Sequence, residues 1–212
     1  MRTFRQRYYD WFSRYYDRFV ALHSTDRQEK LRGLLAEHTG AKRGDKVLDI
    51  CTGTGSTLSR IQRRVGINGL VVGTDFSRGM LRKAQSKTVG FSNVALVEAD
   101  AGHVPFKESI FDAVTCCYAF YELKGKTQEQ CLREIGRVLK PGKPFLMMEH
   151  DVPRRRLIRM LFYVRLLSMG LKKTIQILRQ ERQLLLQHFK HVDKVTMPAG
   201  RTKIMVCRGS KE

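Results

Sequence analysis

The stretch Lys46-Val-Leu-Asp-Ile-Cys-Thr-Gly-Thr-Gly-Ser56 decides how the rest of this chain of 212 residues folds. Its apolar run, residues 47–51, predicts a buried strand, and a helical pattern of apolar residues follows at 56–65. Between them, Gly53 and Gly55 allow a sharp turn and let a ligand approach the backbone closely, and the unpaired N–H groups at the start of the helix face the same space. Strand, glycine turn and helix together predict a cofactor-binding site.

The same turn argues against a dinucleotide cofactor. Gly53 and Gly55 fit the first glycines of the pattern G-x-G-x-x-G, but Leu58 occupies the third position, where close packing of helix and strand requires a small residue. The next apolar run ends at Asp75, 20 residues after Gly55. An acid at that place can accept hydrogen bonds from ribose hydroxyls, so the predicted cofactor contains a ribose.

Further strands and helices alternate along the chain, as is typical of an α/β sheet. The other predicted strands are 94–97, 111–117 and 144–148, and the tail at 192–207 predicts an antiparallel hairpin with its last strand at 203–207. The predicted helices are 3–22, 25–39, a helix capped by Ser77, 127–140 and 174–187.

This series resembles the class I S-adenosylmethionine (SAM)-dependent methyltransferases over roughly residues 40–150, and within them it is most similar to the quinone-ring C-methyltransferases of ubiquinone and menaquinone synthesis. The residues that carry the resemblance are Val47-Leu-Asp49, Asp75-Phe-Ser77, Met80-Leu81, Val104-Pro-Phe106, Phe111-Asp112 and Leu139-Lys-Pro-Gly142.

The resemblance implies a Rossmann-like α/β fold with a seven-stranded sheet whose last strand is antiparallel. We interpret the chain as one domain overall, with an N-terminal helical cap at 1–40 and a SAM-binding core at 41–212 that includes a basic helical insertion at 151–191 after the fifth strand.

The resemblance also assigns cofactor-binding residues. It implies that Asp100 accepts from the adenine amino group and that the N–H of Ala101 meets a ring nitrogen. Phe76 follows the ribose acid, where an apolar side chain can lie against the adenine, and a position in the core is the alternative. The cationic amino acid part of SAM would meet Asp49 and the backbone of two loops. The full predicted set is Tyr16, Asp49, Thr52, Gly53, Gly55, Asp75, Phe76, Asp100, Ala101, Cys117 and Tyr118.

The methyl acceptor is expected beside the loop 117–123, because ligands of open α/β sheets bind beyond the carboxyl ends of the strands. Here the chain departs from the quinone methyltransferases: where they resemble Gly-Leu-Arg-Asn-Val, it has Ala-Phe-Tyr-Glu-Leu at 119–123. Tyr121 stands in place of the arginine thought to help to remove a proton. The candidates for proton removal are Tyr121, Glu122 and His150, with His150 expected just past the end of the fifth strand and open to a purely structural role.

The N-terminal segment 3–22 predicts an amphipathic helix. Tyr8, Phe12, Tyr15, Phe19 and Leu22 recur at spacings of four and three, so we expect this face to pack on the domain. The family carries a Tyr-Asp pair in an N-terminal cap over the cofactor, and Tyr16 with Asp17 matches it best.

The composition excludes several classes of protein. With 42% hydrophobic and 28% charged residues the chain is an ordinary globular protein, and its five cysteines form no C-x-x-C pair that would indicate a zinc site. We expect no metal and no disulfide framework. No signal-peptide pattern and no apolar run of about 20 residues is present, so the expected location is the cytoplasm, either free or peripheral on the inner face of the membrane.

The formal net charge of +20 predicts a polyanionic binding partner: nucleic acid, an anionic membrane surface or an acidic substrate. The alternative is that the charge serves only to keep the protein soluble. The segment 154–173, from Arg154 to Lys173, is both basic and apolar, which suits an anionic membrane surface or a lid over the site. The sequence does not indicate an oligomeric state.

The main hypothesis is a SAM-dependent C-methyltransferase acting on a lipophilic quinone or phenolic precursor at the membrane surface. The alternatives are N-methylation of a phospholipid such as phosphatidylethanolamine, another small acceptor, arsenic, RNA, or SAM binding without catalysis. RNA is disfavoured because no Asn/Asp-Pro-Pro-aromatic motif follows the fourth strand and no Pro-Cys pair occurs.

Overall fold

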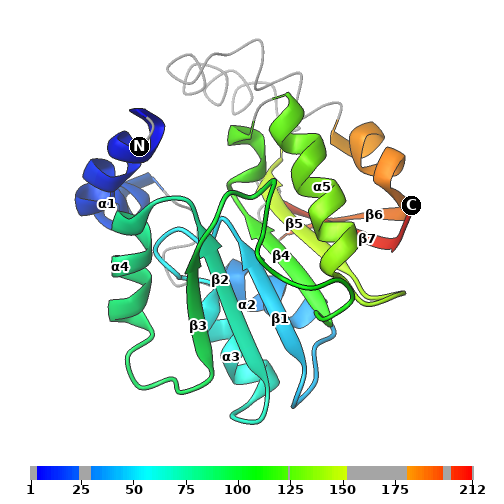
Figure 1. Ribbon diagram of the computed structural model, residues 1–212, viewed down its shortest axis with the longest axis horizontal. Coiled ribbons are helices and arrows are strands. Elements are labelled where there is room, and N and C mark those ends of the chain that lie inside the picture. Colours follow the sequence, from blue (N-terminus) through cyan, green and yellow to red (C-terminus); the bar gives the residue numbers. More distant parts are fainter. Residues whose placement is uncertain (1–3, 24–29, 124, 152–180, 198–201, 212) are drawn as a thin grey trace.

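The computed structural model describes residues 4–23, 30–123, 125–151, 181–197 and 202–211, with the backbone alone for 17–23. These residues form a mixed sheet with helices on both faces (Figure 1). The basic and apolar segment 154–173 of the predicted insertion lies outside the described residues, as do the start of the helix predicted at 25–39 and most of the one predicted at 174–187.

The sheet has seven strands in the order β3-β2-β1-β4-β5-β7-β6. The first five strands in the sequence are parallel to one another, and β7 runs antiparallel to both β5 and β6. The predicted fold, including the antiparallel last strand, is confirmed. The strands are β1 (Lys46–Ile50), β2 (Leu70–Asp75), β3 (Val94–Glu98), β4 (Ala113–Cys117), β5 (Phe145–His150), β6 (Phe189–Thr196) and β7 (Thr202–Ser210).

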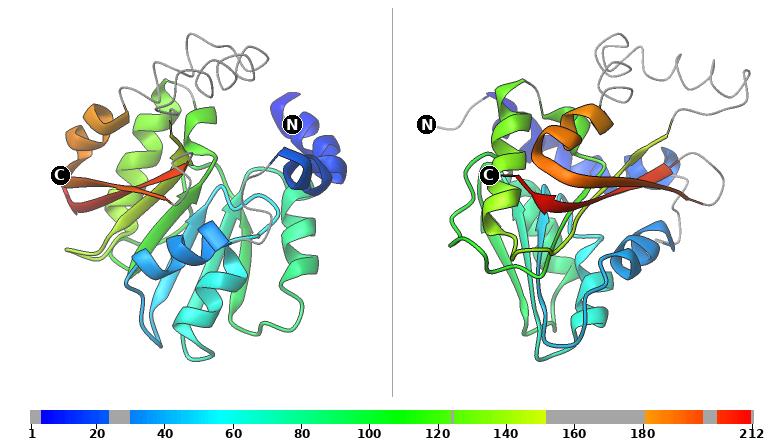
Figure 2. Two further views of the ribbon diagram at one scale, coloured as in Figure 1. Left: turned by 180° about the vertical axis from the view of Figure 1, so that it is seen from behind. Right: turned by 90° about the vertical axis from the view of Figure 1, so that its right-hand side faces the viewer.

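Helices cover the two faces of the sheet, with α5 on one face and α2 and α3 on the other (Figure 2). The helices are α1 (Phe4–His23), α2 (Lys30–His38), α3 (Leu58–Val65), α4 (Arg78–Lys87) and α5 (Lys126–Val138), with a 3₁₀ turn, η1 (Phe120–Glu122), and a helical segment at 181–188. The predicted cap of α4 is confirmed, since the Ser77 hydroxyl accepts a hydrogen bond from the Met80 N–H.

The continuous apolar runs of the central strands follow from this sandwich. Val47 packs against Ile61 and Val65 of α3, while Leu48 and Ile50 pack on the opposite face in the cluster that contains Ile135 of α5. A parallel strand covered on both faces has no solvent side, so its sequence does not alternate.

The predicted boundaries at β5 and β6 are wrong. β5 extends through His150, so Glu149 and His150 lie inside the strand and not past its end, because β7 pairs with both of them. Residues 189–191 belong to β6 and not to the insertion, because the hairpin with β7 begins at Phe189.

The predicted packing face of α1 is also wrong. Tyr8 and Tyr15 are about half exposed, whereas Ser13 is buried. The helix packs beside α4 (Figure 1), and its inner face is polar: Asp10 Oδ1 accepts from the Ser77 hydroxyl at 2.7 Å and from the Gly79 N–H at 2.8 Å. The side chains of Phe19 and Leu22 lie outside the described residues. Within the part of the chain that is described, no helix has the length and apolar character to cross a bilayer.

Candidate functional site

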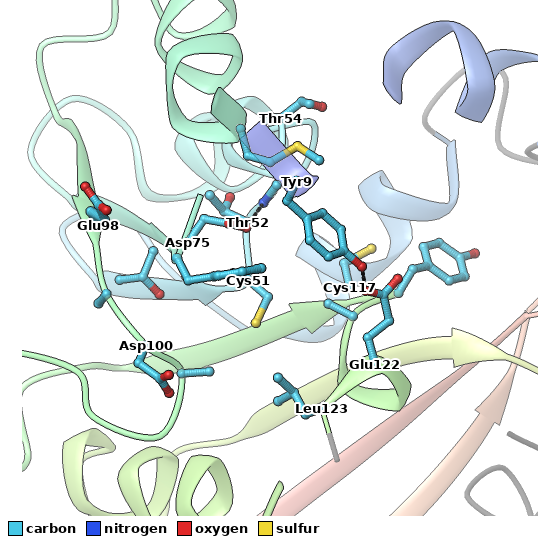
Figure 3. A pocket seen from close by; sticks show the side chains of 18 of the residues that line it. Tyr9, Cys51, Thr52, Thr54, Asp75, Glu98, Asp100, Cys117, Glu122 and Leu123 are labelled. Carbon is cyan, nitrogen blue, oxygen red and sulfur yellow. Dashed lines mark hydrogen bonds between the residues drawn. The ribbon is translucent and has the colours of Figure 1, made fainter. Parts of the chain in front are cut away.

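A cavity of about 760 Å³ opens at the carboxyl ends of β1, β2, β3 and β4 (Figure 3). Parallel strands bring their carboxyl ends to one edge of the sheet, which is where such folds bind ligands. Helices α1 and α2 both contribute residues to the wall of the cavity. Its wall is made by Arg5, Gln6, Tyr9, Tyr16, Arg32, Cys51, Thr52, Gly53, Thr54, Ser56, Thr57, Thr74, Asp75, Phe76, Arg78, Met80, Glu98, Ala99, Asp100, Ala101, Cys117, Tyr118, Ala119, Glu122, Leu123 and Thr127.

The glycine turn forms one part of this wall. Gly53 and Gly55 both have positive φ angles, of 56° and 75°, which favour glycine. A Cβ on Gly55 would come within 2.8 Å of the Ala84 Cβ, so the turn is packed closely against α4, whereas nothing lies within 4 Å of a Cβ on Gly53. The open side of the turn at Gly53 therefore faces the cavity, and Gly55 lies behind it.

Asp75 fixes the turn from the neighbouring strand. Its Oδ2 accepts from the Gly53 N–H and its Oδ1 from the Ser77 N–H, each at 2.9 Å. Burial raises the pKa of Asp75 to about 6, against the opposing effect of these two hydrogen bonds. Each carboxylate oxygen keeps a lone pair for a further donor, so this wall residue can accept hydrogen bonds from ligand hydroxyls.

Asp49 lies behind the wall and not in it. It is buried, and its two oxygens accept from the Thr52 hydroxyl at 2.7 Å and the Thr115 hydroxyl at 2.6 Å. Burial raises the pKa of Asp49 to about 6. Its direct contacts thus hold the start of the glycine turn against β4. Asp49 would act on a ligand only indirectly, by positioning Thr52.

The third strand brings a second set of acceptors to the cavity. Asp100 and Glu98 lie beside Asp75 on one side of the cavity (Figure 3). Asp100 Oδ1 accepts from the Gly102 N–H at 2.8 Å, which fixes the carboxylate on its own loop next to Ala101. Phe76 is in the wall as well, with the Tyr9 ring edge-on at 5.3 Å.

Two residues of the wall have an unusual backbone. Cys51 follows β1 and Tyr118 follows the adjacent strand β4, and their φ angles are 55° and 54°. Non-glycine residues seldom adopt this left-handed conformation, and such strain concentrates at functional sites. At both residues the chain turns toward the cavity directly after a strand ends, β1 for Cys51 and β4 for Tyr118. The Tyr118 ring is held by a hydrogen bond of 2.8 Å between its hydroxyl and that of Thr202.

Helix α1 covers the opposite side of the cavity. The Tyr9 hydroxyl donates to the Glu122 carboxylate (Figure 3). Arg5 Nη2 donates to the Glu122 carbonyl at 3.1 Å. Burial first, and then the Glu122 charge, raise the pKa of Tyr9 above its usual range. Burial also raises the pKa of Tyr16, another wall residue, to about 12. Both phenols therefore stay protonated at neutral pH, and the Tyr9 hydroxyl acts as a hydrogen-bond donor.

The three candidates for proton removal are not equivalent. Glu122 is in the wall of the cavity, but Tyr121 and His150 are not among its residues. The His150 ring lies 4.8 Å from the Tyr118 ring, on the side of β5. Burial raises the pKa of Tyr121 above its usual range. The structure thus brings only Glu122 of the three to the cavity.

All of the predicted cofactor-binding residues except Asp49 and Gly55 line the cavity. These assignments stay predictions. The sequence reasoning missed wall residues that come from helices, chiefly Arg32 of α2 with Arg5 and Gln6 of α1. Arg32 lies 6.0 Å above the Tyr118 ring. No local pattern marks these positions, because they reach the cavity only through the packing of α1 and α2.

Comparison with known proteins agrees with this geometry. A sequence model of the ubiE/COQ5 methyltransferase family matches residues 5–170. The chain is 35% identical over 141 residues to a demethylmenaquinone methyltransferase of Staphylococcus aureus strain JH9, a match that covers 66% of this chain. The chain spans about 58% of the length of that relative.

Solved structures share the fold. A chain from the complex between the Haloferax volcanii Trm112 methyltransferase activator and a methyltransferase has a TM-score of 0.71 at 17% identity, covering 96% of this chain and 98% of its own. A SAM-dependent methyltransferase from Aquifex aeolicus has a TM-score of 0.61 at 20% identity, covering 84% and 88%. Fold, site geometry and the match over residues 5–170 together show that the chain belongs to the ubiE/COQ5 methyltransferase family.

Proposed function

We propose that this protein transfers the methyl group of SAM to a ring carbon of a lipophilic quinol or related phenolic acceptor. The observation that carries the proposal is the family match over residues 5–170, joined to a relative named as a demethylmenaquinone methyltransferase. The arrangement of the cavity supports it, because acids line one side and a carboxylate with aromatic residues lines the other.

The acidic side of the cavity fits the adenosine part of SAM. Asp75 has lone pairs left for two ribose hydroxyls, and Asp100 is fixed by its loop where it can accept from the adenine amino group. The open space over Gly53 lets the ligand approach the backbone. The residues present therefore fit the cofactor.

The amino acid part of SAM needs a partner for its carboxylate, and Arg32 is the cation placed to provide it. Its guanidinium lowers the pKa of Asp49 and of Cys117, although burial outweighs it at both, so its positive charge acts on the end of the cavity next to the glycine turn. A planar guanidinium can hold a carboxylate with two parallel hydrogen bonds. We infer that Arg32 orients the methionine portion.

When bound, SAM supplies a methyl group on a sulfonium, which is already a good leaving group, so the chain contributes mainly orientation and a dry site. The ring carbon forms its bond to the methyl as the carbon–sulfur bond breaks, with electron density from the quinol oxygen. The proton of that ring carbon must then leave. Glu122, held by the Tyr9 hydroxyl at the cavity wall, is the base we assign to it.

The acceptor is proposed to reach the site at a membrane surface. The basic and apolar segment 154–173 and the net charge of +20 support this part of the proposal. We also propose that the protein is located in the reducing cytoplasm and that it forms a single domain with an N-terminal cap at 1–40.

The test is to incubate the chain with methyl-labelled SAM and three acceptors in competition: a prenylated naphthoquinol kept reduced, phosphatidylethanolamine, and total RNA. Label is expected on the ring carbon of the quinol. The variant Glu122→Gln should reduce turnover by about 10²-fold or more while it leaves SAM affinity near that of the unmodified chain. Label on the phospholipid amine would favour an N-methyltransferase, and label confined to RNA would show that the quinol assignment is wrong.

A further inference from the structure

The outward face of α1 is a stripe of large aromatic side chains in solvent. Phe4, Tyr8, Trp11 and Tyr15 have exposed fractions of 87%, 47%, 56% and 51%. They are four, three and four residues apart, which at 3.6 residues per turn places them within an arc of about 60° on one side of the helix. We call these four residues the aromatic stripe.

The orientation of α1 is fixed by its other side, so the exposure of the stripe is a property of the packing. Asp10 accepts from the Ser77 hydroxyl and the Gly79 N–H of α4, and Gln6 Nε2 donates to the Phe76 carbonyl at 3.4 Å. Tyr9 donates to Glu122 across the cavity. The inward side of α1 is thus held by polar contacts, and the four residues of the aromatic stripe are turned away from the domain.

Arginine flanks the stripe. Arg7 and Arg14 are exposed on one side of it and Arg5 on the other. Within residues 4–16 the formal charge is +2, from the three arginines and Asp10, and the Asp10 carboxylate is occupied against α4. The face presented to solvent is therefore aromatic and positively charged together.

We propose that the aromatic stripe of α1 docks the protein on an anionic phospholipid bilayer, with the helix lying in the plane of the interface. Tyr and Trp rings have an apolar body and a polar edge, which suits the level of the lipid headgroups, and arginines beside them meet the lipid phosphates. The positive charge of the stripe and of the whole chain opposes pairing with a second copy through this face.

The docked orientation would bring the cavity to the lipid. Arg5, Gln6, Tyr9 and Tyr16, on the remaining sides of the same helix, line the cavity. A lipophilic acceptor could then pass from the bilayer along α1 to Glu122. This consequence rests on the proposed function, whereas the docking itself does not.

The test uses Trp11, the one tryptophan in the sequence, as its own reporter. The full chain is mixed with vesicles of phosphatidylcholine alone or with phosphatidylglycerol added, and the emission spectrum and co-sedimentation are recorded together. We expect a shift of the emission to shorter wavelength, and binding, with the anionic vesicles only. Brominated acyl chains should quench the bound signal.

Three double variants decide whether the stripe is responsible. Phe4→Gln with Tyr15→Gln keeps Trp11 and should weaken partitioning roughly tenfold or more. The matched control is Ile67→Gln with Val89→Gln, which replaces two other exposed apolar side chains, 75% and 79% exposed. They lie in the loops before β2 and β3, at the amino ends of the strands and thus away from the cavity. This variant should leave partitioning unchanged. Arg7→Gln with Arg14→Gln should weaken binding by about fivefold per arginine and reduce its dependence on salt.

Several results would overturn the proposal. Co-sedimentation without any change in Trp11 emission would place the membrane contact elsewhere in the chain. A shift that grows with protein concentration in the absence of vesicles would show that a second copy covers the stripe. Methylation of a short-chain, water-soluble quinol is measured in parallel, so a failure of the proposed reaction is distinguished from a failure of docking.

Discussion

Asp75 illustrates how one buried carboxylate can both build a site and serve it. Its two oxygens hold the N–H groups of Gly53 and Ser77, which fixes the glycine turn and the cap of α4 relative to each other. The same burial raises its pKa to about 6. Protonation removes acceptor capacity, so the residue should bind ribose hydroxyls well only as the carboxylate.

Affinity for S-adenosylhomocysteine, the product form of the cofactor, should therefore be constant above pH 7 and fall below about pH 6. The sign follows from the raised pKa, because lower pH favours the protonated form that accepts fewer hydrogen bonds. Asp75→Asn should lower the affinity at pH 7.5 by about 10- to 100-fold, since a charged acceptor is lost. Isothermal titration calorimetry measures both effects.

The control for that experiment is Asp193→Asn, which changes an exposed acid on β6. It should leave the affinity and its pH profile unchanged. Asp49 has a similar pKa, so its share of the profile is the part that persists in Asp75→Asn. An unchanged affinity in that variant would show that Asp75 supports the turn and does not contact the ligand.

Glu149 is a second buried acid with a different role. Its Oε1 accepts from the Phe120 N–H at 2.9 Å and from the Tyr121 N–H at 3.4 Å, which holds the loop that carries Glu122. Burial, followed by the nearby Glu181 charge, raises the pKa of Glu149 well above its usual range. Lys203 lies opposite on β7 and lowers the pKa, but it is itself paired with Glu181.

Glu149→Gln should stabilise the protein at neutral pH and have little effect near pH 4. The folded chain holds the Glu149 proton at pH values where the unfolded chain, with a pKa near 4.5, has lost it, so native stability falls as pH rises above that value. Glutamine keeps an acceptor for the loop without this cost. Urea unfolding at pH 4.5 and 7.5 checks the difference, and a variant that is less stable at pH 7.5 would show an ionised Glu149 paired with Lys203.

At the scale of elements, the sequence predicted the sheet well and the attachment of α1 poorly. β2 and the cap at Ser77 follow from local chemistry, namely an apolar run that ends in a turn and a hydroxyl before a helix. The spacing of aromatic residues in α1 identified a face but not its direction. The direction is set by the hydrogen bond that Asp10 of α1 accepts from the Gly79 N–H at the start of α4. This contact joins residues 69 apart in the chain.

For the same reason, Arg32 and Arg5 could not be predicted as wall residues, whereas Asp75 and Asp100 could. The carboxyl end of a strand is a position that the topology itself brings to the site. A helix residue arrives there only through tertiary packing, which no local pattern records. The exchange of the family's Arg-Asn for Tyr121-Glu122 likewise required the structure to show which of the two side chains lies in the wall.

Gly79 is where α1 meets α4, and Gly79→Ala should separate them. A Cβ there would come within 2.6 Å of Ser13 Oγ and 2.7 Å of the Asp10 carbonyl oxygen, while its own helical conformation would accept alanine readily. We expect the sheet to keep its stability, and the amides of α1 to exchange hydrogen faster. Affinity for S-adenosylhomocysteine should fall, because Tyr9 and Tyr16 are displaced from the cavity.

The matched control is Gly33→Ala in α2, where nothing lies within 4 Å of the added Cβ. It should be neutral or slightly stabilising, since alanine is the better helix former. Hydrogen exchange with mass spectrometry reads both variants. Equal exchange of α1 in Gly79→Ala and in the unmodified chain would mean that the helices tolerate the clash and that α1 is held chiefly by the Glu122 contact.

Over the whole molecule, charge repulsion should outweigh ion pairing. The chain has 40 basic and 20 acidic residues, an excess of 20 positive charges. The ion pairs Arg133–Glu129 and Arg208–Asp193 are exposed, and pairs of this kind contribute little. Excess like charge destabilises the compact state, and salt screens it over a distance of about 10 Å at 0.1 M.

Raising the salt concentration from about 0.02 M to 0.3 M should therefore increase the stability of the fold, because a shorter screening length weakens the repulsion between like charges. The midpoint of urea unfolding should move to higher urea, whereas a protein held by surface ion pairs would move the other way. Chloride and fluoride salts at equal ionic strength separate screening from binding of a particular anion. A midpoint that is insensitive to salt would show that the basic residues are spaced widely enough in the folded chain to repel no more than they do in the unfolded one.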